Sequence, residues 1–140
     1  MSLQNQLVIF DFANGQVQVR LEGETVWLSQ AQMAELFGTS SDNISLHLKN
    51  IYKEQELQEA ATTEDFSVVR QEGKRQVQRQ VRHYNLDAII SVGYRISSGR
   101  ATRFRQWATS VLQQHLTQGF TLNRQRFEQN AAELEATLAL

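Results

Sequence analysis

The first thirty positions show the apolar pattern of short strands. Apolar residues dominate positions 7–12 and occupy every second position in 17–21. Asn14-Gly15 lies between these runs and is a dipeptide that favours a tight turn between strands. Residues 25–28 form a third apolar run. The pattern predicts an N-terminal β-hairpin followed by a third strand.

The period of the pattern then changes to that of helices. A helix is predicted over residues 30–37, with Ser29 as its N-cap and Gly38 in the left-handed conformation that commonly ends helices. A second helix is predicted over residues 41–51, with Ser40 as its N-cap. The apolar positions of this second helix form one stripe for burial: Ile44, Leu48 and Ile51.

The middle of the chain predicts a second hairpin and a further helix. Residues 53–65 are acidic and predict a short helix followed by a loop. Residues 66–71 and 74–84 predict two strands joined by a basic turn. Residues 86–96 predict a helix whose N-cap is Asn85. The succession of strands and helices indicates an α+β domain.

Two C-terminal helices are predicted, over residues 100–118 and 123–140. Apolar residues in the last one repeat at alternating steps of four and three, a narrow stripe that packs against a partner helix. The partner is either a second copy of the chain, which would give a homodimer, or the chain's own domain. We expect residues 1–120 to form one domain. We expect residues 121–140 to begin a further region of a longer protein, because the pattern runs to the last residue.

Composition excludes several classes of protein. With 41% hydrophobic and 21% charged residues, the chain has the composition of a soluble globular domain. The absence of cysteine excludes a disulfide scaffold and cysteine-ligated zinc. No apolar run approaches the ~20 residues that a membrane span needs, and the start of the chain lacks the features of a signal peptide. We therefore expect a cytoplasmic protein that does not associate with membranes.

Positive charge is concentrated in one part of the sequence, although the net charge is only −1. Residues 70–105 contain nine basic residues and two acidic ones. This segregation favours a surface that faces a polyanion. The alternative is solvated charge that scatters over several faces of the folded domain.

No pattern in the sequence indicates catalysis, a metal or a cofactor. The three histidines, His47, His83 and His115, fall on three different predicted elements and lack the spacing of metal ligands. No glycine-rich phosphate loop and no nucleophile elbow is present. We expect that the protein is not an enzyme and that it binds neither a cofactor nor a metal.

The two predicted helices around Gly38 satisfy the spacing of a helix-turn-helix. Counted from Gln30 as position one, Ala34 is a small residue at position five, where the second helix crosses closely. Gly38 provides the turn at position nine, and Ile44 is the aliphatic plug at position fifteen. The hairpin that follows would be a wing. The sequence therefore predicts a winged helix-turn-helix-like domain with an N-terminal β-hairpin and C-terminal helices.

The polar side of the second helix is the candidate reading surface, because the start of such a helix enters the major groove of DNA. Asn43 has the amide that pairs with adenine, while His47 and Lys49 suit phosphate or guanine. The negative charge of Asp42 would repel the phosphate groups of DNA. A basic wing tip would reach phosphates or the minor groove. The predicted DNA contacts are Ser40, Ser41, Asn43, Ser45, His47, Lys49, Asn50, Arg70, Lys74, Arg75, Arg79, Arg100 and Arg103.

Most of the chain, about residues 17–127, resembles the virulence RhuM family, and it resembles the Bro-N and KilA-N class of viral DNA-binding domains more distantly. The most specific block is YNLDAIISVGYRI at residues 84–96. The resemblance implies a bacterial DNA-binding protein found near restriction-modification or mobile loci, commonly about twice this length. The chain departs from the family at Ser41-Asp42-Asn43 and at Leu46, near which relatives often carry a basic residue. Further blocks of resemblance lie at residues 27–37, 44–51 and 101–109.

Two functions stay open at this point. The first is sequence-specific binding of double-stranded DNA, as a transcriptional regulator or as an accessory factor of a mobile or restriction-modification locus. The alternative is a protein-interaction adaptor that keeps the helix-turn-helix core and dimerises through its C-terminal helix. The two differ in salt dependence, because contacts to phosphate weaken steeply as salt rises.

Overall fold

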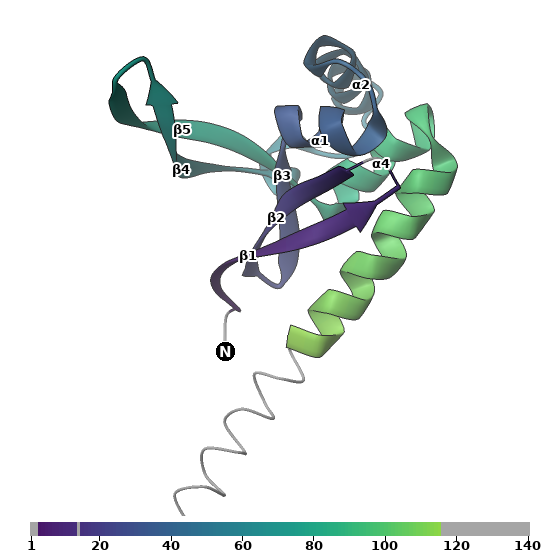
Figure 1. Ribbon diagram of the computed structural model, residues 1–140. Coiled ribbons are helices and arrows are strands. Elements are labelled where there is room, and N and C mark those ends of the chain that lie inside the picture. The colour runs from purple at the N-terminus through teal and green to yellow at the C-terminus, as the bar shows by residue number, and fades with distance from the viewer. Residues whose placement is uncertain (1–2, 14, 116–140) are drawn as a thin grey trace, which may run out of the picture.

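A computed structural model describes residues 3–13 and 15–115 of the chain, which form an α+β fold (Figure 1). Five antiparallel strands make one sheet in the order β1-β2-β3-β5-β4. The last described helix, over residues 98–115, follows α4. The labelled elements are β1 (Leu3–Phe12), β2 (Gly15–Gly23), β3 (Thr25–Ser29), α1 (Gln30–Phe37), α2 (Ser41–Lys53), α3 (Glu59–Thr62), β4 (Thr63–Glu72), β5 (Arg75–Asn85) and α4 (Leu86–Ile96).

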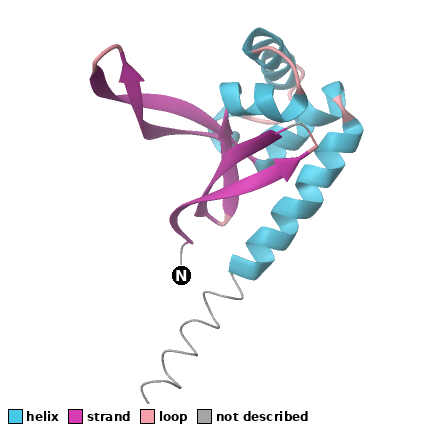
Figure 2. Ribbon diagram, viewed as in Figure 1, coloured by secondary structure: helices cyan, strands magenta, loops and turns pink. Residues whose placement is uncertain are grey.

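The helices gather around the part of the sheet that β1, β2 and β3 form, while β4 and β5 extend away from it as a long hairpin (Figures 1 and 2). One hydrophobic core lies between the helices and the sheet. Because side chains alternate across a strand, only one face of β2 contributes Val17, Val19 and Leu21 to this core. Its fully buried helical side chains include Met33, Leu36, Ile44, Ile51, Ile89 and Phe104.

Gly93 sets how closely α4 approaches its neighbours. A Cβ atom at this position would lie 2.5 Å from Phe37 Cζ and 2.7 Å from the Cβ of Ala101. No side chain larger than hydrogen fits there without moving its neighbours. Gly93 therefore lets α1, α4 and the helix over residues 98–115 pack together.

Within the part of the chain that the structure describes, the predicted elements are confirmed in kind, and α1 has the predicted bounds. Several boundaries were wrong. β1 begins at Leu3 rather than at residue 7, and β2 covers Gly15–Gly23 rather than residues 17–21. Residues 63–65 were predicted as a loop, but they pair with Tyr84, His83 and Arg82 as the first residues of β4. This pairing depends on β5, which extends to Asn85 and there pairs with Trp27 of β3 on its other side. The second helix continues to Lys53 rather than residue 51, and the last described helix begins at residue 98 rather than 100.

The predicted helix over residues 123–140, and with it the expected dimerisation stripe and the region 121–140, lies outside the described residues. Residues 116–118 of the preceding helix lie outside them as well. None of the helices that the structure describes is both long and apolar enough to span a membrane.

Candidate nucleic-acid interface

Both ends of α1 are fixed by specific hydrogen bonds. At its start, Ser29 Oγ accepts a hydrogen bond from Gln32 N (3.3 Å), and Gln32 Oε1 accepts one from Ser29 N (2.9 Å). This reciprocal arrangement is a capping box. At its end, Gly38 has φ = +66°, the left-handed conformation that the sequence predicted. The orientation of α1, and of the turn that leads to α2, is therefore well determined by local contacts.

The crossing of α1 and α2 has the residues that a close helix pair needs. Ala34, on α1, is buried, and Ile44, on α2, is fully buried. Leu48 and Ile51 continue the inward stripe of α2, each no more than 3% exposed. Ala34 and Ile44 are thus buried on facing helices, and Gly38 adopts the left-handed conformation between them. The opposite side of α2 consequently faces away from the domain.

The predicted contacts on α2 are accessible to different degrees. Ser41 and Lys49 are exposed, while Asn43 and His47 are half-buried, as are Ser45 and Asn50. Asn43 Nδ2 donates a hydrogen bond to Thr39 Oγ1 (2.9 Å). An amide has two N–H donors and an accepting oxygen, so Asn43 keeps one donor and its acceptor for a base. The Oγ of Ser40 caps α2 by accepting a hydrogen bond from Asn43 N (3.1 Å).

The β4–β5 hairpin has a tight tip in which Gly73 adopts φ = +62°. Arg79 forms an ion pair with Glu72 across the strands (2.8 Å). Within residues 3–13 and 15–115, the other predicted basic contacts of the hairpin form no ion pair: Arg70, Lys74 and Arg75. These three side chains are therefore the hairpin's available cations, and Arg79 is not one of them.

A groove of about 300 Å³ lies where the hairpin meets the starts of α1 and α2. Its walls include Ser41 at the start of α2 and Arg70 on β4, so two of the predicted contacts come together here. Gln30 Nε2 donates a hydrogen bond to the Tyr84 hydroxyl (3.1 Å) and ties α1 to β5 at the same place. The remaining lining residues are Ser29, Ala31, Val81 and Arg82.

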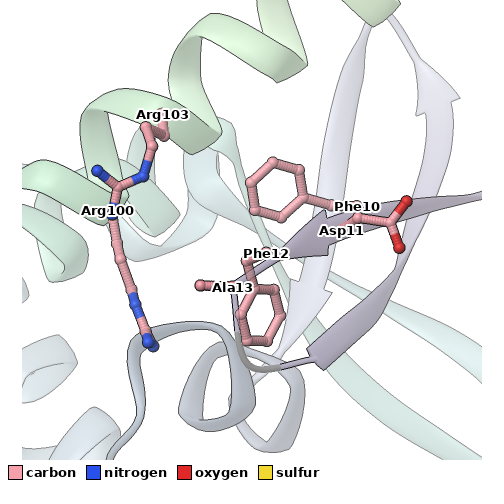
Figure 3. A pocket seen from close by; sticks show the side chains of 6 residues that line it. All are labelled: Phe10, Asp11, Phe12, Ala13, Arg100 and Arg103. Atoms are coloured by element: carbon pink, nitrogen blue, oxygen red, sulfur yellow. The ribbon is translucent and has the colours of Figure 1, made fainter.

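The two predicted arginines of the last described helix lie elsewhere. Arg100 and Arg103 face Phe10 and Phe12 across a recess of about 480 Å³ (Figure 3). Arg100 Nη1 donates to the Leu36 carbonyl oxygen (2.9 Å), and its guanidinium carbon lies 5.4 Å from the centre of the Phe12 ring. Arg100 is thus engaged in holding α1. Arg103 is exposed and forms no ion pair with any residue that the structure describes, which leaves it available for an anion.

The basic residues of 70–105 do not all remain free. Arg79, Arg82 and Arg95 form ion pairs, and Arg95 is held by both Glu54 (2.7 Å) and Glu56 (3.3 Å). Hydrogen bonding to Glu54 raises the pKa of Arg95. The remaining cations divide between the hairpin and the helix over residues 98–115, which lie on either side of α1 and α2 in Figure 1. The unpaired basic residues within 70–105 therefore form two separate groups and not one continuous positive surface.

An aromatic cluster fixes the base of the hairpin. Phe66 on β4 packs edge-on against His83 on β5, with ring centres 5.1 Å apart, and against Trp27 on β3 at 5.5 Å. The guanidinium of Arg20 lies 4.6 Å above the Phe66 ring. Burial lowers the pKa of His83, and its Nδ1 lies 2.8 Å from the Val81 carbonyl oxygen, to which it must donate. The hairpin therefore leaves the domain in a defined direction.

Leu46 was noted from the sequence only as a departure from the family pattern, and it was not predicted as part of the outward face of α2. Leu46 lies opposite the buried stripe of α2 and is 55% exposed. A helical projection anchored on Ile44 and Leu48 would have found it, because it places an apolar side chain among the polar ones.

Residues 61–137 match the virulence protein RhuM family. No curated protein and no solved structure matches the chain.

Among the described residues, no three histidine or acidic side chains are grouped as a metal site would require.

Proposed function

The chain belongs to the virulence protein RhuM family, and we propose that it binds double-stranded DNA in a sequence-specific manner. In this proposal α1 and α2 form a helix-turn-helix, α2 enters the major groove, and the β4–β5 hairpin is a wing. The cellular role would be that of a transcriptional regulator or an accessory factor of a mobile or restriction-modification locus, as the family resemblance implies.

The observation that carries the proposal is the groove shared by the start of α2 and the hairpin. Ser41 and Arg70 come from segments about thirty residues apart and line one recess. A helix start provides free backbone N–H groups, and an arginine binds phosphate oxygens with two parallel hydrogen bonds. A DNA backbone passing through this groove would place α2 against the base edges beside it.

Side chains on α2 have the chemistry for reading bases. Asn43 keeps a donor and an acceptor, which is the pair that matches the N6 and N7 atoms of adenine. Lys49 is exposed farther along the helix. The contact to Thr39 also fixes the Asn43 amide in one orientation, which reduces the entropy lost when it binds.

The test is selection of binding sites from random duplexes with the full chain, followed by affinity measurement at several salt concentrations. Arg75→Ala should weaken binding to every sequence and reduce the slope of log K against log salt by about 0.9, the value for one phosphate contact. Asn43→Ala should alter the preferred sequence instead. Arg105→Ala is the charge-matched control, since Arg105 is exposed on the helix over residues 98–115 and lies outside both the groove and the β4–β5 hairpin that carries Arg75.

Absence of any selected sequence, or of any effect of both variants, would exclude this interface. The alternative, an adaptor that binds proteins through apolar C-terminal residues, predicts little dependence on salt. A steep slope for the unmodified chain therefore separates the two functions.

A further inference from the structure

Leu46 occupies the centre of the outward face of α2 without a structural reason. Its side chain is 55% exposed, whereas the three inward apolar residues of the same helix are at most 3% exposed. Leu46 is also the only large exposed apolar residue among the described residues of α2. Burial in the domain core therefore does not account for a leucine at this position.

The neighbours of Leu46 on the helix surface are polar. At steps of three and four residues these are Asp42, Asn43, Lys49 and Asn50. A docking surface for another protein normally needs a wider apolar area than one side chain provides. The major groove, by contrast, presents one isolated apolar group on its base pairs, the 5-methyl group of thymine. A single leucine surrounded by polar groups matches that chemistry.

On the basis of the proposed function, we propose that Leu46 is a specificity-determining residue that contacts the 5-methyl group of a thymine in the recognised duplex. The hydrogen-bonding side chains on either side of it would read the edges of adjacent base pairs. Leu46 adds a requirement that hydrogen bonds do not impose, because deoxyuridine has the same pairing and accepting groups as thymidine and lacks only the methyl.

The experiment uses that difference. In the duplex selected by the unmodified full chain, each thymidine is replaced in turn by deoxyuridine, and affinity is measured for the unmodified protein and for Leu46→Ala. One replacement should weaken binding of the unmodified protein about fourfold, the factor that corresponds to burying one methyl group. Leu46→Ala should bind the thymidine duplex about as weakly as the unmodified protein binds the deoxyuridine duplex, and should not distinguish the two.

Leu7→Ala is the matched control, because Leu7 is 56% exposed on the edge strand β1 and lies outside α2. It should keep the full preference for thymidine. The inference is overturned if no replacement affects the unmodified protein, if Leu46→Ala keeps the fourfold preference, or if Leu46→Ala changes only self-association. In each of those cases a selected duplex still binds, so the proposed function stands. If no duplex is selected at all, the proposed function itself fails.

Discussion

Arg100 Nη1 donates a hydrogen bond to the carbonyl oxygen of Leu36 over 2.9 Å, which joins the helix over residues 98–115 to the last turn of α1. The last carbonyl groups of a helix lack partners within it and carry partial negative charge, so a guanidinium is a favourable partner. A residue sixty-four positions away thus completes the C-terminal end of α1.

We predict that Arg100→Ala lowers the free energy of unfolding by about 2 kcal/mol, because a hydrogen bond to a charged donor is lost. Arg103→Ala should change it by less than about 0.5 kcal/mol, since Arg103 is exposed and its guanidinium forms no ion pair among the described residues. Urea unfolding of both variants measures this difference. Equal losses for the two variants would contradict the assignment of Arg100 to a structural role.

We predict that two arginines of the hairpin differ in their effect on DNA binding although each variant removes one charge. Arg70→Ala should weaken binding and reduce the salt slope by about 0.9. Arg79→Ala should reduce the slope less, because the Arg79 guanidinium already pairs with Glu72 at 2.8 Å. Fluorescence anisotropy with one duplex at several salt concentrations compares them. A larger change in slope for Arg79→Ala than for Arg70→Ala would mean that Arg79, and not Arg70, contacts the phosphate.

We predict that Gly93→Ala destabilises the domain, even though the intrinsic helix propensity of alanine exceeds that of glycine by about 1 kcal/mol. The added Cβ would lie 2.5 Å from Phe37 Cζ, and overpacking of this kind costs about 1–3 kcal/mol or more. Gly99→Ala is the control, since the nearest atom to its Cβ would be 3.7 Å away, at the flexible end of Arg103. Thermal unfolding should show a lower Tm only for Gly93→Ala.

We predict that stability decreases in mild acid because of His83. Its pKa is lowered in the fold, chiefly by burial, so the unfolded chain takes up a proton first as the pH falls below about 6.5. The stabilisation is complete above that pH and is lost between 6.5 and the lower pKa of the folded state. His83→Gln cannot titrate, and its unfolding free energy, measured with urea across this range, should fall less steeply. Parallel pH profiles would exclude His83 as the cause.

Patterns among neighbouring residues were sufficient to predict most of the helices and strands. The capping hydroxyls of Ser29 and Ser40, the turn at Gly38 and the stripe of Ile44 act over a few residues, so their pattern is visible in the chain itself. For the same reason the presence of both hairpins and the bounds of α1 were predicted correctly. Residues 63–65 were missed because their strand pairing depends on β5, some twenty residues away.

The sequence alone therefore established the α+β class, the helix pair and a strongly basic segment, because periodicity, capping and charge are properties of neighbouring residues. Which basic residues are free was settled by long-range contacts: Arg95 pairs with Glu54, and Arg100 is held at Leu36, partners more than forty residues distant. The groove between Ser41 and Arg70 likewise exists only once the hairpin meets the starts of α1 and α2. Contacts of this kind follow from the packing of whole elements, and no local pattern encodes them.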